Sequence, residues 1–359
     1  METQDPASAQ DRAGDQQESP LAEEPQLAEA SSALTRDRRT PVPTASGFFE
    51  IVFVGPGGIR PGWRLCIWAI AAGTAGFVFG GLAALMVRHA PAETQPLGVM
   101  FGDGIPFVGV LAATILMSRI ERRTLADYAL PVREAFGSQF WQGVLWGLSA
   151  LSLLLGAIHL CHGFDLGGVA LTGGTLAEYA VLWAIAFLVV GLFEESVMRA
   201  YALFTLTDGI RFWPAAGLLS GAFGAIHLGN RGEDWIGVLA AALIGLFFCF
   251  TVRRTGSLWF AVGMHFAWDY AESFIYSVPD SGVMVTGHLL NSSFHGPAWL
   301  TGGTVGPEAS VFVFVIIAAL FVAFGLTHRD IRFPRVAAVQ PLEPARTSLR
   351  DKSPLGFGS

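Results

Sequence analysis

The sequence predicts an all-α, polytopic membrane protein: a bundle of about eight transmembrane helices with a disordered N-terminal tail. Of the 359 residues, 52% are hydrophobic and 14% are charged, whereas a soluble domain carries about 25% charged residues. The mean hydropathy is +0.50, and several apolar runs approach the roughly 20 residues that cross a bilayer. The length alone would allow two soluble domains, but these runs favour one membrane bundle.

The two ends of the chain are polar. Residues 1–47 are rich in Ala, Glu, Gln, Pro and Ser and contain few large apolar side chains. Such a segment cannot bury enough surface to offset its ordering entropy, and it lacks the basic start and short apolar core of a signal peptide. We therefore expect a disordered cytoplasmic tail at 1–47, a bundle at about 60–330 and a polar C-terminal tail at 331–359.

Eight apolar runs define the predicted spans. They cover residues 65–87, 97–117, 140–160, 176–206, 214–228, 235–252, 258–276 and 311–326. The first is flanked by Arg64 and Arg88, and the second accommodates Asp103 and Pro106 near its start. A basic stretch precedes the third span. The fourth is too long for one crossing at about 1.5 Å per residue, so one of its ends is predicted to project.

The last four spans are bounded by clear signals. Pro214 suits the first turn of the fifth helix. Arg253 and Arg254 close the sixth span, and a long Gly/Ser/Pro-containing loop at 279–307 separates the seventh from the eighth.

The arginines predict the orientation. The stretch at 119–139, Arg253 and Arg254 fall on the same side as the N-terminal tail, whereas Arg88 and Arg231 fall on the other. Because cytoplasmic segments carry the excess of Lys and Arg, and because the number of spans is even, both termini are predicted to be cytoplasmic. In a bacterium the membrane would be the plasma (inner) membrane.

The fourth span carries the sequence FEESVMRAY, with three charged residues in an apolar context. An ionisable side chain in a bilayer costs about 2.5 kcal/mol or more, which makes it a functional candidate. Glu195 and Arg199 are four residues apart and can pair on one helical face. Glu194 points about 100° away and stays outside that pair.

Two later spans carry further ionisable residues. FGAIHLGN places His227 at the end of the fifth span, and GMHFAWDYAE places His265 and Asp269 four apart on one face of the seventh, with Glu272 a further turn along. A lone histidine on an apolar helix is usually a satisfied packing residue. Four such residues together, Glu194 included, favour function over structure, because isolated buried charges are rare in bilayers.

The chemistry of this set leaves two mechanisms open. A free carboxylate and a histidine can polarise a water molecule, and a second histidine can donate to the oxyanion formed when water attacks a carbonyl. Alternatively, Glu194, His227, His265 and Asp269 offer the nitrogen and oxygen ligands of a catalytic zinc. There is no HExxH motif, so a metal site would need three helices. The metal content stays open between zinc and a metal-free site.

The expected partners are lipid and a hydrophobic peptide or protein. No basic stripe with interleaved aromatic residues is present, so nucleic acid is not an expected partner. Large side chains near the motifs are predicted either to contact a hydrophobic substrate or to fill the core. These are Phe193, Phe223, Phe266 and Trp268.

Three motifs on separate spans resemble one family. EESVMR fits EExxxR, FGAIH fits FxxxH and HFAWD fits HxxxN/D, in that order. Together they resemble the CPBP family of intramembrane proteases, which includes the type II CAAX prenyl endopeptidases and bacterial Abi-like proteins. The resemblance covers about residues 119–275, and ERRTLADYAL at Glu121–Leu130 is similar to the polar segment that precedes the core in this family.

The resemblance implies roles for the first two motifs. Glu194 and His227 would activate the attacking water. Glu195 and Arg199 would orient the site or contact the carboxy-terminal end of the substrate.

The third motif implies an oxyanion site made by His265 and residue 269. This chain has Asp269 where otherwise similar members carry asparagine, and an ionised aspartate cannot donate to an oxyanion. Asp269 would therefore be protonated, orient His265 or bind a metal.

The resemblance implies an intramembrane endopeptidase that cleaves near the C-terminus of a membrane-associated peptide or protein. Prenylated CAAX substrates are of a eukaryotic type, so a bacterial member would cleave another peptide class. The alternatives are a non-enzymatic immunity or scaffold protein and a proton-coupled transporter. Inverted repeats would favour transport, and the sequence shows none.

Overall fold

The structure is a computed structural model that describes residues 52–55, 58–87 and 95–333. The chain divides into two units at residue 52, and the helices described below belong to the second unit. The predicted N-terminal tail at 1–47, and the C-terminal tail from 334 onward, lie outside the described residues.

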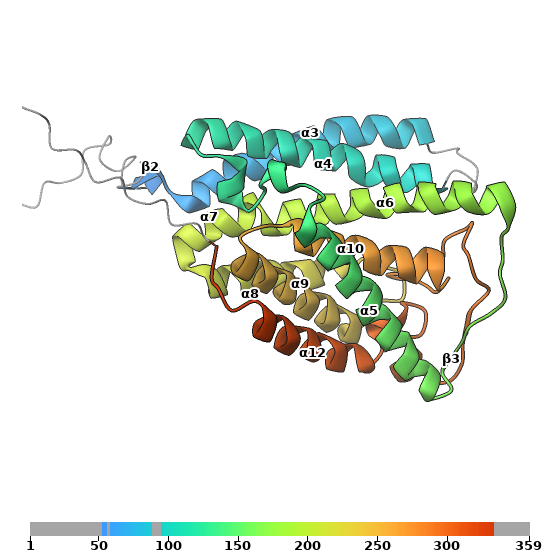
Figure 1. Cartoon of the computed structure of the whole chain (residues 1–359). Coiled ribbons are helices and arrows are strands. Elements are labelled where there is room, and N and C mark those ends of the chain that lie inside the picture. The colour runs from blue at the N-terminus through green and yellow to red at the C-terminus, as the bar shows by residue number, and fades with distance from the viewer. Residues whose placement is uncertain (1–51, 56–57, 88–94, 334–359) are drawn as a thin grey trace, which may run out of the picture. The chain divides into compact units, whose positions relative to one another are not determined.

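Nine helices of ten or more residues form the described bundle (Figure 1). They are α3 (Pro61–Val87), α4 (Gln95–Glu121), α5 (Ser138–Leu160), α6 (Gly173–Arg199), α7 (Tyr201–Ile210), α8 (Phe212–His227), α9 (Trp235–Thr255), α10 (Trp259–Asp269) and α12 (Phe312–Thr327). The all-α prediction is confirmed, and every predicted span coincides with a helix.

Short elements connect these helices. They are η2 (Leu125–Tyr128), η3 (Val132–Glu134), the π-helix η4 (Tyr270–Ile275), α11 (Ala298–Thr301) and η5 (Pro307–Ala309). Two antiparallel pairs of two-residue strands complete the described fold. The strands are β1 (Val54–Gly55) with β2 (Gly58–Ile59), and β3 (Phe164–Asp165) with β4 (Ser293–Phe294).

Five of the eight predicted spans are long and apolar enough to cross a membrane by themselves. The other three are shorter: α8 and α12 have 16 residues each, and α10 has 11. η4 continues α10 by six residues, so the seventh predicted span is an α-helix that ends as a π-helix. A π turn shifts the side chains that follow it and is frequent at functional sites.

The fourth predicted span is interrupted. α6 ends at Arg199, and Ala200 leaves the helical region with φ −93° and ψ −108° before α7 begins. Together the two helices cover 38 residues. The break falls within the FEESVMRAY segment, so the two glutamates lie on α6 and Tyr201 opens α7.

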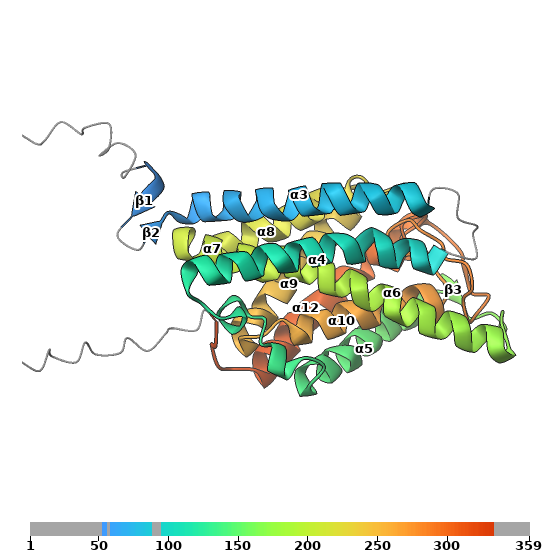
Figure 2. The same cartoon turned by 90° about the horizontal axis from the view of Figure 1, so that it is seen from above.

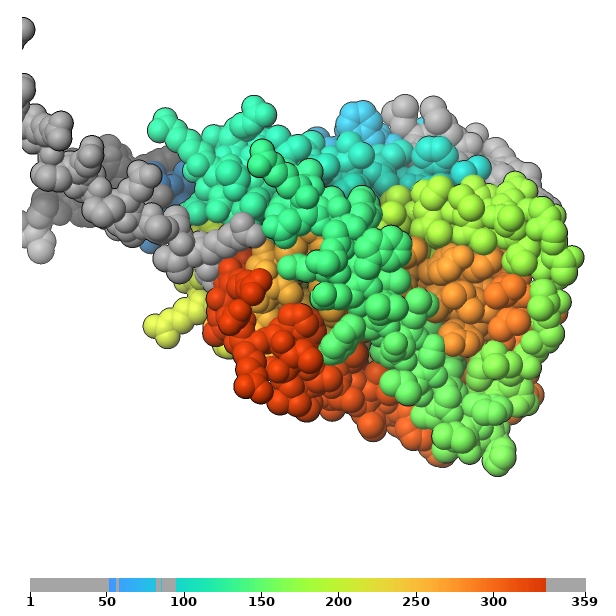
Figure 3. Space-filling view, in the orientation of Figure 1, coloured from blue at the N-terminus to red at the C-terminus, as the bar shows by residue number. Residues whose placement is uncertain are grey.

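Two layers of helices can be followed in Figures 1 and 2. α3 and α4 lie side by side and pack against α6 and α7, whereas α5 crosses α10, and α8, α9 and α12 complete the other side. In the space-filling view α5 crosses this face diagonally, and the chain that follows α10 fills the space between α6 and the β3 end (Figure 3). Outward-facing apolar side chains such as Phe77, 84% exposed, suit a lipid surface.

Glycines set the close approach of α5 to α10. A Cβ atom at Gly143 would lie 2.1 Å from the carbonyl oxygen of Phe260, and one at Gly263 would lie 2.1 Å from that of Phe140. Small residues allow membrane helices to pack backbone against backbone. These contacts fix α10, and with it His265, against the rest of the bundle.

Glu121 joins four elements at the end of the bundle where α3 begins. Its carboxylate accepts two hydrogen bonds from Arg64, at 3.0 and 2.7 Å, and one from the hydroxyl of Tyr128 at 3.0 Å. The hydroxyl of Tyr201 donates to it as well. The Glu121–Leu130 segment is therefore tied to α3 and to the first residue of α7.

Candidate active site

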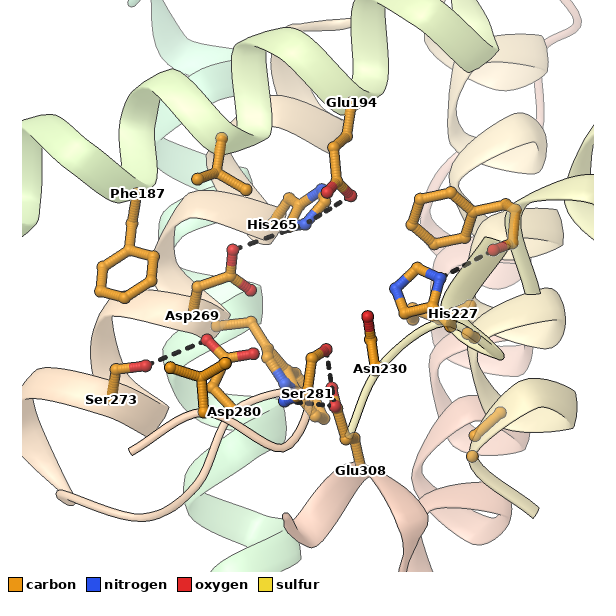
Figure 4. A pocket seen from close by; sticks show the side chains of 18 of the residues that line it. Phe187, Glu194, His227, Asn230, His265, Asp269, Ser273, Asp280, Ser281 and Glu308 are labelled. Atoms are coloured by element: carbon orange, nitrogen blue, oxygen red, sulfur yellow. Dashed lines mark hydrogen bonds and ion pairs between the residues drawn. The ribbon is translucent and has the colours of Figure 1, made fainter. Parts of the chain in front are cut away.

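A cavity of about 440 Å³ lies among α4, α6, α8, α9, α10 and α12 (Figure 4). Its polar lining comes from helices and loops alike. The polar residues are Gln95, Asp103, Glu194, His227, Asn230, Glu233, His265, Asp269, Ser273, Asp280, Ser281 and Glu308. Apolar side chains such as Trp183, Phe187 and Ile244 form the rest of the wall. Four of the six predicted site residues therefore share one cavity.

The other two predicted site residues lie behind the cavity wall. Nη1 of Arg199 donates to Oε1 of Glu195 at 2.9 Å, and both side chains are fully buried. The guanidinium carbon lies 4.3 Å from the centre of the Phe223 ring, within reach of a cation–π interaction. The predicted Glu195–Arg199 pair therefore forms, and neither residue lines the cavity.

His265 connects this pair to the cavity. Its Nδ1–H donates to Oε1 of Glu195 at 2.9 Å. Its Nε2 lies 3.7 Å from Oε2 of Glu194 and 3.5 Å from Oδ2 of Asp269. The bond at Nδ1 fixes the ring orientation and directs Nε2 to the two cavity carboxylates, as a carboxylate partner does for functional histidines generally.

His227 faces this group from the opposite wall. Its Nδ1–H donates to the carbonyl oxygen of Phe223 at 2.7 Å, so a neutral ring keeps Nε2 unprotonated and able to accept a proton. Figure 4 shows the second ring nitrogen turned toward the cavity, with Glu194 and His265 across from it. His227 closes α8, and Asn230 follows it in the next turn.

The arrangement offers the groups that peptide hydrolysis needs. Glu194 is a cavity carboxylate with 31% of its side chain exposed, and His227 contributes an accepting nitrogen. His265 can donate from Nε2 when protonated. An acid–base pair beside a donor for an oxyanion is a hydrolytic arrangement.

The donors proposed for a zinc ion are less compact. Among the described residues, one group of three or more His, Cys, Asp or Glu side chains brings its ligand atoms within 4.8 Å of one another: Glu272, Asp280 and Glu308. The set of Glu194, His227, His265 and Asp269 shares the cavity without meeting that spacing. Zinc ligands lie about 2.0–2.2 Å from the metal, so these side chains would need to move inward to bind it together.

Several cavity residues were not among the predicted site residues. Asp103 was noted only as a tolerated charge, and Asp280 and Glu308 lie in and beyond a loop to which no function was assigned. The composition of that loop gave no helical periodicity from which to place them. Glu272, three residues after Asp269, was the one nearby acidic residue that the sequence marked.

The aromatic residues near the motifs divide between wall and core. Phe223 and Trp268 line the cavity. Phe193 and Phe266 pack instead against the central hydrophobic cluster. Only the first two are in position to contact a substrate.

Two carboxyl groups outside the long α-helices have raised pKa values. Burial, followed by the charge of the neighbouring Glu308, raises the pKa of Asp280 to about 7. Burial also raises the pKa of Glu308 to about 7, although hydrogen bonds from Ser281 act in the opposite direction. The loop side of the cavity is therefore crowded with acidic groups, on which the charge of His265 acts in the opposite direction to burial.

One family model matches the chain. Residues 175–271 match the family described as type II CAAX prenyl endopeptidase Rce1-like. The matched segment contains all six predicted site residues, and the match confirms the family resemblance drawn from the three motifs. No curated protein and no solved structure matches the chain. Together with the five long apolar helices, the match supports an integral membrane protein that is similar to the CAAX-type endopeptidases.

Proposed function

We propose, from the match to the type II CAAX prenyl endopeptidases, that this chain hydrolyses a peptide bond in a membrane-associated peptide or protein. The observation that carries the proposal is the meeting of Glu194, His227 and His265, from three different helices, at one cavity. The apolar wall suits a hydrophobic peptide, and the exposed apolar helices suit lipid.

The attacking water lies between the carboxylate of Glu194 and Nε2 of His227. One of these groups takes the proton of the water as its oxygen attacks the scissile carbonyl. Nε2–H of a protonated His265 donates to the resulting oxyanion. When the C–N bond breaks, the abstracted proton passes to the leaving amine, which restores the site.

Glu195 and Arg199 act as positioning residues. Both are fully buried and lie outside the cavity lining, which favours orientation of His265 over contact with the substrate. Asp269 lies 3.5 Å from Nε2 of His265, which favours its role as an orienting or hydrogen-bonding partner of that ring.

A zinc version of the mechanism uses the same residues. Zn²⁺ held by Glu194, His227, His265 and Asp269 would supply a Lewis acid and an acidified water. Phenanthroline separates the two versions. Full cleavage after chelation supports the metal-free site, whereas loss of cleavage that zinc restores supports the metal site.

The membrane orientation follows from the arginines. Arg64, Arg123, Arg211, Arg253 and Arg329 lie near the helix ends where α3 begins and α12 ends. By the positive-inside rule that end, with both termini, is cytoplasmic, in a plasma membrane if the host is a bacterium.

This orientation places the loop-lined end of the cavity away from the cytoplasm. Asn230, Asp280 and Glu308 follow or precede the opposite helix ends and line the cavity. A substrate would then enter from the non-cytoplasmic side or from the lipid on that side. Labelling of single cysteines at residues 231 and 329, each introduced after Cys66, Cys161 and Cys249 are replaced by Ser, tests the orientation. It predicts labelling from outside at 231 alone.

Cleavage of a peptide library by the purified protein tests the function. We expect Glu194→Gln and His227→Ala each to lower the rate by about 10²–10⁴-fold, the usual contribution of a general base. Glu178→Gln and His162→Asn, at exposed positions outside the cavity, should cleave at the wild-type rate. Wild-type rates in both cavity variants would remove this mechanism and return the scaffold and transporter alternatives.

A further inference from the structure

Three carboxylates from separate elements meet at the loop side of the cavity. Glu272 lies on η4, Asp280 lies in the loop after it and Glu308 lies on η5. One oxygen atom from each lies within 4.8 Å of the other two. The cluster begins one residue beyond the segment that matches the protease family, which ends at residue 271.

Glu272 has no partner for its charge. Its side chain is 0% exposed, and neither carboxylate oxygen has a hydrogen-bond partner. Within the described part of the chain, no arginine or histidine forms an ion pair with Glu272, Asp280 or Glu308. A buried carboxylate is stable only when it is protonated, paired or bound to a cation.

The other two carboxylates are oriented by hydrogen bonds. The hydroxyl of Ser273 donates to Oδ2 of Asp280 at 3.0 Å. The backbone N–H and the hydroxyl of Ser281 donate to Oε1 of Glu308 at 2.7 and 2.9 Å. Each bonded carboxylate keeps its other oxygen for a further ligand. Figure 4 shows Asp280, Ser281 and Glu308 gathered below the catalytic candidates.

The backbone holds the cluster closed. Gly306 has φ +129°, and a Cβ atom there would lie 2.1 Å from the carbonyl oxygen of Pro279 and 3.1 Å from Oε1 of Glu272. Only glycine allows the loop to pass this close. The N–H of Tyr276 donates to the carbonyl of Ala271 at 2.7 Å, the bond of the π turn that contains Glu272.

We propose that Glu272, Asp280 and Glu308 form a binding site for a hard divalent cation, Ca²⁺ or Mg²⁺. Carboxylate oxygens are the ligands these ions prefer, and two oxygens on one Ca²⁺ are at most about 5 Å apart, given bonds of roughly 2.3–2.6 Å. The cluster's oxygens lie within 4.8 Å of one another, inside that limit for Ca²⁺. Mg²⁺, with bonds of roughly 2.0–2.1 Å, would draw them to within about 4.2 Å. Water would complete the coordination from the cavity.

The bound cation ties the loop at 279–307 to the end of α10. Glu272 belongs to the helical continuation of α10, whereas Asp280 lies near the start of the loop and Glu308 directly follows its end. Because Asp280 and Glu308 also line the cavity, the ion fixes the loop wall beside Asp269 and His265. It also compensates the negative charge on that wall.

Cation binding to the full-length protein in detergent tests this site without any substrate. Protein stripped with EDTA is titrated by calorimetry with CaCl₂ or MgCl₂ to about 10 mM, a range that covers weak sites. We expect one saturable ion per chain and a Tm raised by several degrees in the cation that binds. The result is independent of the proposed protease function, because neither measurement uses cleavage.

Two ligand variants and one control locate the ion. Glu272→Gln and Asp280→Asn should each weaken binding by at least about 100-fold, because loss of an outer-shell partner alone costs 10–100-fold. Glu178→Gln, at an exposed position on α6, should bind as the wild type does. If one ligand variant fails to fold, the other still provides the comparison.

Two results would overturn the proposal. One is an absence of saturable binding and of any cation effect on the wild-type Tm, which would leave a cluster that shares protons. The other is unchanged affinity in the ligand variants, which would place the ion elsewhere.

Discussion

His265 connects the buried Glu195–Arg199 pair to the carboxylates that line the cavity. On one side its ring bonds to Glu195, which is itself paired with Arg199; on the other it faces Glu194 and Asp269. In the proposed mechanism each carboxylate therefore has a separate role. Glu195 orients the ring of His265, Glu194 acts on the water, and Asp269 lies beside the nitrogen that would donate to an oxyanion.

The buried pair should be sensitive to removal of one charge. Arg199→Met leaves Glu195 without its cationic partner and should destabilise the protein by about 3–5 kcal/mol. The double variant Glu195→Gln/Arg199→Met should recover much of the loss, because neither charge then remains. Denaturant unfolding in detergent measures both, and equal stability of the two variants would contradict the pair's electrostatic role.

Asp269 gives a second test at this scale. Asp269→Asn should keep most of the activity, because an amide keeps polar contact with Nε2 of His265 and can donate to an oxyanion. Asp269→Leu should lose activity. The kcat/KM of each variant, relative to wild type, measures the retained activity. An inactive Asp269→Asn variant would instead indicate that the carboxylate is obligatory, as it is for a metal ligand.

Much of the site was predictable from the sequence because its residues lie on helices. The spacing of four residues put Glu195 beside Arg199, and His265 beside Asp269, and both contacts are present. The cavity positions of Asp280 and Glu308 were not predictable. They depend on a loop whose path is fixed by long-range contacts such as those of Gly306, and no local periodicity reports such contacts.

At the scale of elements, the packing of α5 against α10 holds the third motif in place. Gly143 on α5 faces the backbone of α10 at Phe260 and Met264. The helix that carries His265 is short, with 11 residues before the π turn. Its position therefore depends mainly on this contact with α5.

A side chain at this contact should displace α10. Gly143→Leu requires the helices to separate, because even a Cβ atom would lie 2.1 Å from a backbone oxygen. We expect a lower Tm and loss of cleavage. Gly156→Leu is the control, since a Cβ atom on the same helix there meets no atom within 4 Å; a stable, active Gly143→Leu would mean that α5 and α10 are not in close contact.

The apolar runs predicted where the helices lie but not where their geometry changes. The predicted spans located every long helix, but the break at Ala200 and the π turn at 270–275 were not predicted. Both are local departures from a regular α-helix, and the apolar runs from which the spans were predicted continue through them. Neither segment contains a Pro or Gly that would mark the departure in the sequence.

At the scale of the whole molecule, the described bundle carries two distinct ends. One is fastened by Glu121, which joins α3, α4, η2 and α7. The other holds the acidic loop wall of the cavity, with Asp280 and Glu308. Substitutions at the Glu121 end should therefore change the stability of the protein. Substitutions at the cavity end should change binding and cleavage.

The acidic wall should make stability depend on pH when no divalent cation is present. The pKa values of Asp280 and Glu308 are about 7 in the folded protein, against roughly 4 when unfolded. The folded state therefore binds more protons between these values, and stability falls as the pH rises from about 4 to about 7. In EDTA, the Tm of wild type should fall more between pH 5 and pH 8 than that of Asp280→Asn; parallel curves would contradict these pKa values.

The central claim is that Glu194 and His227 act on one water molecule in a shared cavity. A double-variant cycle on peptide hydrolysis, with wild type, Glu194→Gln, His227→Ala and the double variant, measures this most directly. Groups that act as a unit show strongly non-additive losses, so the double variant should cleave about as slowly as either single variant. Losses that multiply in the double variant would show that the two residues work independently and would contradict the shared site.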